Sequence, residues 1–185
     1  DTFDILYYSR YDIEEAIIPP QINIVMEYSF YSHKKLKSII FPENSKLKKI
    51  DLKAFSESSI KKLVLPESVE EIKNNCFNEV PNLTDLSISS KNQKFSYIDN
   101  KYLVKKSNEN SPIYDMIIFA RRDIESIEIP SNITKICEYA FQNCNKLNSI
   151  KFEENSSLEI IESSAFSLIR GQQKIVIPPS VREIE

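Results

Sequence analysis

The hydrophobic positions of this chain recur in a fixed order. The stretch at residues 124–147 has it most completely: Ile127 and Ile129 alternate with polar residues, Pro130 interrupts, and Phe141 closes the unit after a small residue. Alternation predicts a β-strand, because successive side chains point to opposite faces of a sheet. Proline ends the strand, because it has no N–H to donate to a neighbouring strand.

Variants of this pattern fill most of the chain. An apolar run that ends on proline or a polar corner is followed by an apolar pair spaced by three and a small residue before phenylalanine. The small-aromatic pairs are Ser29-Phe30, Ala54-Phe55, Cys76-Phe77, Ala140-Phe141 and Ala165-Phe166. The proline-terminated runs begin at Ile39, Leu63, Ile127 and Ile175. A period of this length is typical of a solenoid, in which each repeat is a strand, a corner, a short extended run and a short helical turn.

One gap between repeats is longer than the others. It contains Tyr102-Leu103-Val104, a polar loop, and a second apolar run from Tyr114 to Phe119. We interpret residues 92–123 as an inserted β-hairpin with its tip near residues 107–111.

A second periodicity of 111 residues lies over the first. Pro19 matches Pro130 and Tyr28 matches Tyr139 at this offset. We therefore expect a single solenoid over residues 1–185, with about seven repeats, that begins and ends within repeats of a longer parent. One repeat has too few apolar side chains to fold alone, so neighbouring repeats must stack. The terminal repeats should also favour end-to-end or edge association.

Composition and charge exclude several classes of function. The net charge of −3 gives no field to attract nucleic acid or an anionic membrane. The longest apolar runs are too short to cross a bilayer, so direct membrane insertion is not expected. Gly171 is the only glycine, so a glycine-rich phosphate loop is excluded and no cofactor is expected.

The repeat pattern, L-x-x-I-x-I-P-x-x-[VI]-x-x-I-x-x-x-[AC]-F-x-x-C, resembles the BspA-type leucine-rich repeat, the Treponema pallidum class. The inserted hairpin resembles that of trichomonad-type protozoan surface members. The resemblance implies an α/β fold, a curved leucine-rich-repeat solenoid with a parallel sheet and one inserted β-hairpin. It also implies relatives that are adhesins binding host matrix components or cells. Members of the family usually have glycine directly after the second residue of the apolar pair that is spaced by three. Other residues replace it here, so a left-handed backbone is not expected at Met26, Asp51, Lys73, Cys137 and Glu162.

Residues with catalytic or metal-binding chemistry are few. His33 is the only histidine, and it occupies the repeat position that Cys144 fills elsewhere, so we interpret it as structural rather than as part of a hydrolytic triad. Cys76 fills a small-residue position and should be a buried thiol. Cys137 and Cys144 could pair or bind metal, but free thiols are favoured because further Cys or His ligands are lacking. We therefore expect no enzyme activity, no metal site and no cofactor site.

The outward positions of the strands are the best candidates for binding. These candidate ligand-face residues are Ser38, Ile40, Lys62, Val64, Asp85, Ser87, Ser126, Glu128, Ser149, Lys151, Lys174 and Val176. The hairpin at residues 95–119 is a second candidate. A mixed solvated face is the alternative reading of the same positions. Three N-x-[ST] sequons give candidate glycosylation sites at Asn82, Asn132 and Asn155.

Two functions remain open. The first is a recognition module, part of a larger cell-surface or extracellular adhesin-like protein, that binds a protein or matrix ligand through its repeats. The second is an intracellular, cytoplasmic scaffold on the same fold. The absence of a disulfide framework and of any visible leader favours the second, whereas the family resemblance favours the first.

Overall fold

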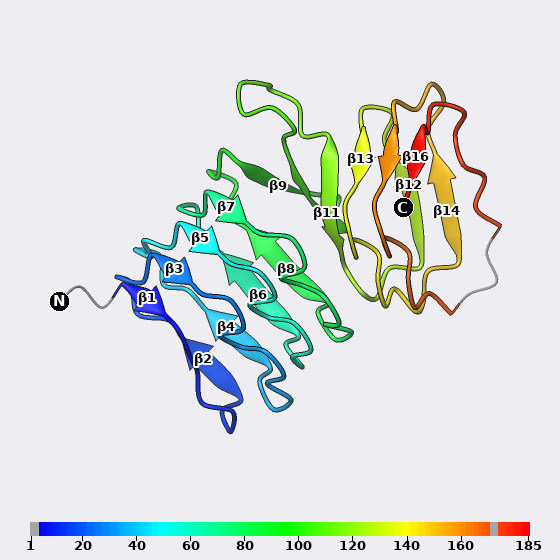
Figure 1. Ribbon diagram of the computed structural model, residues 1–185. Helices are drawn as coiled ribbons and strands as arrows, with labels where there is room; N and C mark the ends of the chain where they lie inside the picture. The colour runs from blue at the N-terminus through cyan, green and yellow to red at the C-terminus, as the bar shows by residue number, and fades with distance from the viewer. Residues whose placement is uncertain (1–3, 171–173) are drawn as a thin grey trace. The chain divides into compact units, whose positions relative to one another are not determined.

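The computed structural model describes residues 4–170 and 174–185, and it divides into two compact units, Asp1–Lys94 and Phe95–Glu185. Both units are built from short β-strands joined by turns (Figure 1). Among the described residues, the first unit contributes strands β1 to β8 and the second unit strands β9 to β16.

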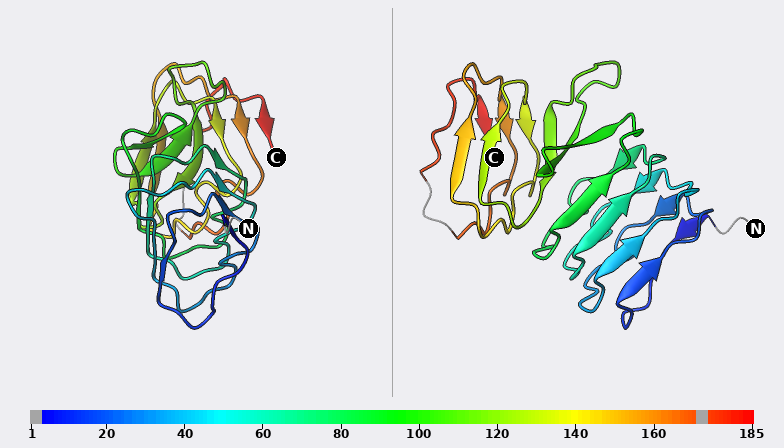
Figure 2. Two further views of the ribbon diagram at one scale, coloured as in Figure 1. Left: turned by 90° about the vertical axis from the view of Figure 1, so that its left-hand side faces the viewer. Right: turned by 180° about the vertical axis from the view of Figure 1, so that it is seen from behind.

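The first unit consists of two parallel sheets. Each repeat adds a short strand to one sheet and a longer strand to the other, which Figures 1 and 2 show as two rows. One sheet has the order β1-β3-β5-β7, with strands Ile5–Leu6, Ile24–Val25, Lys49–Ile50 and Glu71–Ile72. The other has the order β2-β4-β6-β8, with strands Glu15–Ile17, Ser38–Ile40, Lys62–Leu65 and Asp85–Ile88. The parallel stacking of repeats is therefore confirmed.

The second unit begins with antiparallel strands. β10 (Tyr102–Lys105) pairs with β9 (Phe95–Ile98) and with β11 (Met116–Ala120), at the place where the sequence predicts a hairpin. The pairing of β10 with β11 is irregular between Leu103 and Val104. From β11 the sheet continues in parallel through β13 (Lys135–Ile136), β15 (Ile160–Ile161) and β16 (Glu183–Ile184). A separate two-stranded sheet pairs β12 (Ser126–Ile129) with β14 (Ser149–Phe152).

The 111-residue periodicity is visible in the strand register. Ile5 pairs with Ile24 in the first unit, and the residues 111 positions later, Met116 and Lys135, pair in the second. Likewise Glu15 pairs with Ser38, and Ser126 pairs with Ser149. The two units therefore share the strand register over this part of the block. The last pair is one residue out of step, because Lys49 pairs with Glu71 whereas Ile160 pairs with Glu183.

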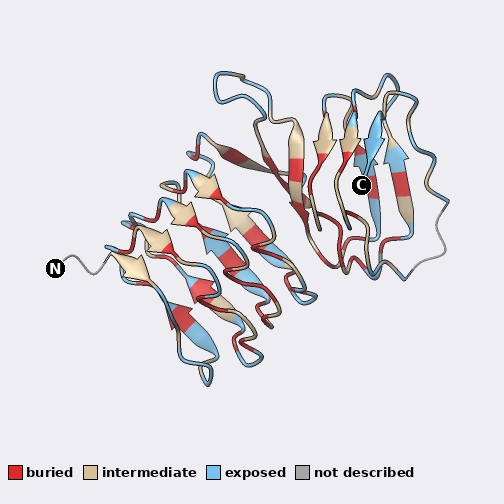
Figure 3. Ribbon diagram, in the orientation of Figure 1, coloured by how far each residue is buried: buried red, intermediate tan, exposed pale blue. Residues whose placement is uncertain are grey.

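The inward side chains of each unit form a stacked core. Within the longer strands, a buried residue lies between exposed or half-buried ones, visible as the red band across β2, β4 and β6 in Figure 3. The phenylalanines of the small-aromatic pairs also stack. The rings of Phe30 and Phe55 have centroids 5.8 Å apart, and those of Phe55 and Phe77 are 5.9 Å apart. Each aromatic side chain thus packs on the next repeat.

The predicted short helical turn is wrong, because the described residues contain no helix. Instead, each small-aromatic pair lies in a run of β-turns with a positive φ two positions before and two positions after the phenylalanine. These residues are Tyr28, Ser32, Lys53, Glu57, Asn75, Glu79, Tyr139, Asn143, Ser164 and Leu168. A left-handed residue interrupts the succession of right-handed residues that a helix requires.

The turns have a regular hydrogen-bonding pattern. For example, the Ala54 N–H donates to the Asp51 carbonyl with Lys53 as the left-handed third residue, as in a type II turn. The usual glycine position, occupied here by Asp51, has no positive φ. The same holds for Met26, Lys73, Cys137 and Glu162, so the sequence prediction of no left-handed backbone at these positions is confirmed.

The turns also bind successive repeats to one another. The Phe30 N–H donates to the Ala54 carbonyl at 2.8 Å, and the Phe141 N–H donates to the Ala165 carbonyl at 2.8 Å. Backbone hydrogen bonds between neighbouring repeats therefore form on the turn side as well as within the sheets.

One predicted strand is wrong. Residues 174–178 have no strand assignment and do not extend the β12-β14 sheet. Pro178 and Pro179 remove two successive N–H donors at this corner. The other Pro-Pro corner, Pro19-Pro20, follows β2, which also lies at the edge of its sheet.

Candidate ligand face

The longer strands of the first unit bring their outward residues into register. One row runs Ser38, Lys62, Asp85 and a second row runs Ile40, Val64, Ser87. β2 extends both rows by one residue, since Glu15 pairs with Ser38 and Ile17 pairs with Ile40. Sequence reasoning missed Glu15 and Ile17, although the 111-residue offset places them at the positions of Ser126 and Glu128.

The second row is an exposed aliphatic stripe, which we define as Ile17, Ile40 and Val64. Their exposed fractions are 69%, 41% and 42%, respectively. In contrast, the residues between the two rows are buried, as at Ile39 and Leu63. Fully burying an aliphatic side chain is worth about 1.5–3 kcal/mol, so a partner that covers the stripe gains part of this at each of the three neighbouring positions.

The first row is polar and internally paired. Ser38 Oγ donates to the Glu15 carboxylate at 2.9 Å, and Lys62 Nζ lies 3.3 Å from the Asp85 carboxylate. Both members of the Lys62–Asp85 pair are more than half exposed, so the pair contributes little to stability. The charged row therefore borders the aliphatic stripe on one side.

A groove borders the other side of the stripe. Its volume is about 540 Å³, and its lining includes Val64 of the stripe, Phe41, Pro66 and the corner carboxylates Glu43 and Glu67. Glu43 and Glu67 are exposed. The groove thus combines apolar side chains with two carboxylates and one basic residue, Lys91.

The corresponding face of the second unit is more charged. Ser126 pairs with Ser149, and Glu128 pairs with Lys151, which places opposite charges side by side. Lys174 and Val176 are exposed but lie in irregular backbone beside β14, because the predicted third strand does not form. These two residues line a groove of about 720 Å³ with residues of β14.

The three sequon asparagines are all exposed. Asn132 Nδ2 donates to the Tyr114 carbonyl at 2.9 Å, so its side chain is held against the segment that leads into β11. Asn155 lies at a turn with a φ of 58°. Asn82 lies in the turn that precedes β8.

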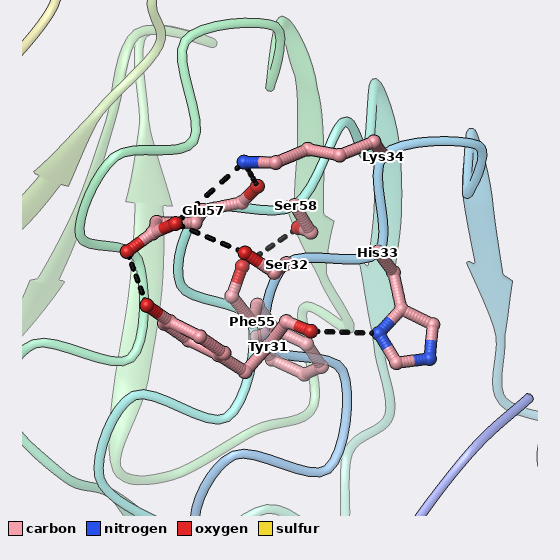
Figure 4. Close-up of polar contacts among 7 residues, drawn as sticks. All are labelled: Tyr31, Ser32, His33, Lys34, Phe55, Glu57 and Ser58. Carbon is pink, nitrogen blue, oxygen red and sulfur yellow. Dashed lines mark hydrogen bonds and ion pairs between the residues drawn. The ribbon is translucent and has the colours of Figure 1, made fainter. Parts of the chain in front are cut away.

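His33 is fully buried in the first unit. Its ring nitrogens lie 3.0 Å from the Tyr31 carbonyl oxygen and 3.2 Å from the Ser9 carbonyl oxygen, and its ring stacks on Tyr11. Figure 4 shows the imidazole turned away from the carboxylate of Glu57. The ring thus contacts backbone and aromatic groups, and no Ser-His-carboxylate triad is assembled around it among the described residues.

A polar cluster bridges two repeats beside His33 (Figure 4). Tyr31 Oη donates to one Glu57 oxygen at 2.5 Å, Ser32 Oγ donates to the other at 2.9 Å, and Lys34 Nζ donates to the Glu57 carbonyl. The hydrogen bond to Glu57 raises the pKa of Tyr31, and the hydrogen bonds from Tyr31 and Ser32 lower the pKa of Glu57. The cluster holds the left-handed residues Ser32 and Glu57 together.

The three cysteines are free and buried, as the sequence favours. Burial raises the pKa of Cys137 to about 12 and also raises that of Cys144. Arg122 is buried beside Cys144, donates to the Ala140 carbonyl at 2.9 Å and lies 4.4 Å from the ring centroid of Phe119. Burial lowers the pKa of Arg122. These groups pack the second unit.

The described residues offer neither a metal-binding cluster nor a membrane-spanning helix. Over residues 4–170 and 174–185, no three His, Cys, Asp or Glu side chains converge on a point where a metal ion could bind. Within the same ranges, no helix has the length and apolar character needed to cross a bilayer.

The chain is similar to known leucine-rich repeat proteins in sequence and in fold. Residues 4–111 and 112–185 match the family model described as the BspA type leucine rich repeat region, in six copies. The structure of pneumococcal vaccine antigen PcpA is 25% identical with a TM-score of 0.78, covering 92% of this chain and 40% of PcpA. A leucine rich cell surface protein from Faecalibacterium prausnitzii is 19% identical with a TM-score of 0.58, covering 95% of this chain and 60% of that one.

A leucine-rich repeat protein from Bacteroides ovatus is 22% identical with a TM-score of 0.50, covering 93% of this chain and 45% of that one. At these identities, the likenesses to the Faecalibacterium prausnitzii and Bacteroides ovatus proteins are evidence for the fold alone. This chain spans less than two thirds of each of the three proteins. Among curated proteins, none matches it.

Proposed function

The chain belongs to the BspA-type leucine-rich repeat family, and from that premise we propose that it is a non-catalytic recognition module of a larger, adhesin-like protein at the cell surface. Its ligand is a protein or matrix component. The module binds through the outward residues of the longer strands of its first unit, and the antiparallel strands at residues 95–120 are a second contact element.

The observation that carries this proposal is the aliphatic stripe. Ile17, Ile40 and Val64 are exposed at neighbouring positions on three strands held in register by the backbone. Repeat arrays present such ladders as extended binding surfaces. Exposed contiguous apolar groups rimmed by polar residues are typical of protein–protein contact sites.

The location at the cell surface is supported by the likeness to PcpA, which is described as a vaccine antigen. The second candidate is an intracellular scaffold on the same fold, favoured by the three free, buried cysteines. Labelling with a membrane-impermeant reagent separates the two. A surface protein is labelled on intact source cells, whereas a scaffold is labelled only after lysis.

Binding itself is tested with the purified chain against a panel of purified extracellular-matrix proteins. We expect saturable binding to at least one of them, weakened about tenfold by Ile40→Lys, which puts a charge in the middle of the stripe. The matched control is Lys151→Ala, on the equivalent strand of the second unit. A folded chain that binds no panel member, or binds equally well with Ile40→Lys, would overturn the proposal.

A further inference from the structure

We propose that the ligand of the first unit is an amphipathic α-helix. The helix lies across β2, β4 and β6 with its apolar residues on the aliphatic stripe and with basic residues beside Glu43 and Glu67. This inference rests on the proposed function and names the chemistry of the partner that the face would take.

The spacing of the stripe selects a helix over an extended peptide. Ile17, Ile40 and Val64 lie on adjacent hydrogen-bonded strands, so neighbouring positions are about 4.8 Å apart and the outer two about 9.6 Å apart. Along a helix, residues i, i+3 and i+7 rise by about 4.5 and 10.5 Å, which follows the stripe closely. In an extended chain, residues i, i+2 and i+4 rise by about 6.6 and 13 Å. These distances exceed the spacing of the stripe, so an extended peptide would match only one of its three residues.

The shape beside the stripe also suits a wide occupant. Val64 belongs both to the stripe and to the groove of about 540 Å³, whose lining includes Phe41, Pro66 and Ile88. The apolar surface is therefore broader than one row of side chains at β6. A helix that places apolar residues at i, i+3, i+4 and i+7 presents a face of this kind, as in other helix-in-groove complexes.

The carboxylates beside the stripe favour a partner with basic side chains. Glu43 and Glu67 are exposed on the groove side of the stripe and form no ion pair in the described part of the chain. On the opposite side, the Glu15 carboxylate already accepts a hydrogen bond from Ser38, and Lys62 faces Asp85. Lys or Arg on one flank of the helix would therefore meet two available carboxylates, and Lys91, which also lines the groove, would reduce this attraction.

The second unit does not share this chemistry. The residues equivalent to Ile17 and Ile40 are Glu128 and Lys151, which pair with each other across β12 and β14. The charged side chains of Glu128 and Lys151 would lose hydration against the apolar face of a helix, so this row is unsuited to such a ligand. The second unit therefore supplies the matched control positions.

The probes are three synthetic peptides of about 16 residues, because shorter or unconstrained helices are marginal in water. The helix probe is side-chain crosslinked, with Leu at i, i+3, i+4 and i+7 and Lys on one flank. The strand probe has the same composition with Leu at alternate positions and no crosslink. The reversed probe is the crosslinked helix with its charge reversed, with Glu in place of Lys. Binding of each to the whole chain is measured by fluorescence anisotropy.

We expect the helix probe to bind at least about tenfold more tightly than the strand and reversed probes. The double substitution Ile40→Thr with Val64→Thr, which keeps strand-forming residues, should weaken binding about tenfold. The double substitution Glu43→Gln with Glu67→Gln should weaken it severalfold and reduce its dependence on salt. The control, Glu128→Thr with Lys151→Thr, should leave it within about twofold of wild type.

Equal binding of helix and strand probes, no binding of the helix probe, or an unchanged affinity in the Ile40 and Val64 double variant would each overturn the inference. Binding to the panel of matrix proteins tests the proposed recognition function separately. A panel ligand that is lost with Ile40→Lys, together with no binding of the helix probe, leaves the recognition function standing and removes only the helical partner.

Discussion

Phe141 stacks on Phe166 with ring centroids 5.1 Å apart and ring planes inclined by 18°. Phe141 is fully buried in the core of the second unit, whereas Phe166 is only partly buried and packs against that core. The two rings occupy the same position in consecutive repeats, so the aromatic column is a contact between repeats rather than within one.

Replacing Phe141 with alanine should lower the free energy of unfolding by about 3–5 kcal/mol, because a ring-sized cavity is left between repeats. Phe166→Ala is the matched variant and should cost clearly less, because its ring already faces solvent in part. Equilibrium denaturation of both variants measures the difference. A loss below about 1 kcal/mol for Phe141→Ala would mean that this ring does not fill the core.

Leu168 is an exposed residue with a φ of 57°, a conformation that costs a residue with a Cβ about 1–2 kcal/mol. Leu168→Gly should therefore be more stable than Leu168→Ala by about 1 kcal/mol in chemical denaturation, since both remove the same side chain. Lys73 is the control, because it lies outside the set of positive φ values. There the glycine variant should be the less stable of the pair, and the same order at both positions would refute the role of the backbone.

The sequence predicts those parts of the fold that depend on buried apolar side chains. The phenylalanine column and the alternating strands follow from residues such as Phe55, Ile39 and Leu63, whose burial leaves a direct mark on the sequence. The turns were not predictable in the same way. Tyr28, Lys53 and Leu168 are not residue types that favour a positive φ, so the left-handed backbone that replaces the predicted helix is imposed by hydrogen bonds between repeats.

The candidate face was predicted in part. Ile40 and Val64 were found because they alternate with buried residues, whereas Ile17 lies in a strand that contains Ala16 as its buried residue and has a weaker apolar signal. The alternation at residues 174–177 predicts a strand, but alternation reports burial rather than pairing, and these residues form no strand. The Pro178-Pro179 corner does not account for the difference, because β2 is paired although Pro19-Pro20 follows it.

Cys137 should make the folded protein less stable in alkali. Burial raises its pKa to about 12, from an unfolded value near 9, so its stabilising contribution is complete below about pH 9 and is lost as the pH rises toward 12. At about pH 10 the loss amounts to roughly 1 kcal/mol. The measurement is the free energy of unfolding between about pH 8 and 10 for wild type and Cys137→Ala.

The alanine variant should show a smaller decline over this range, since it lacks the titrating thiol. Cys144→Ala tests the same effect at a second buried thiol whose pKa is also raised. Parallel curves for wild type and Cys137→Ala would contradict the assignment of this alkaline sensitivity to Cys137.

The Tyr31–Glu57 hydrogen bond should couple two repeats. In a double-mutant cycle of Tyr31→Phe and Glu57→Gln, we expect a coupling of about 0.5–1 kcal/mol, modest because the Glu57 side chain is about one third exposed. Urea denaturation of the four proteins gives this value. The pair Tyr31→Phe with Glu70→Gln is the control and should be additive, because Glu70 faces Lys48 instead.

The strand register shared by β1-β3 and β11-β13 bears on how such a chain changes length during evolution. Ile5 meets Ile24 as Met116 meets Lys135, so copying or losing a block of 111 residues brings equivalent strand edges together. A recombination event between equivalent points of two blocks would therefore preserve the backbone hydrogen bonds at the junction, whereas one that is out of phase by a single residue would turn the apolar side chains of a strand toward water. Gene duplication can thus lengthen this protein in whole blocks with little structural penalty, and the exposed residues of each new copy are left to diverge.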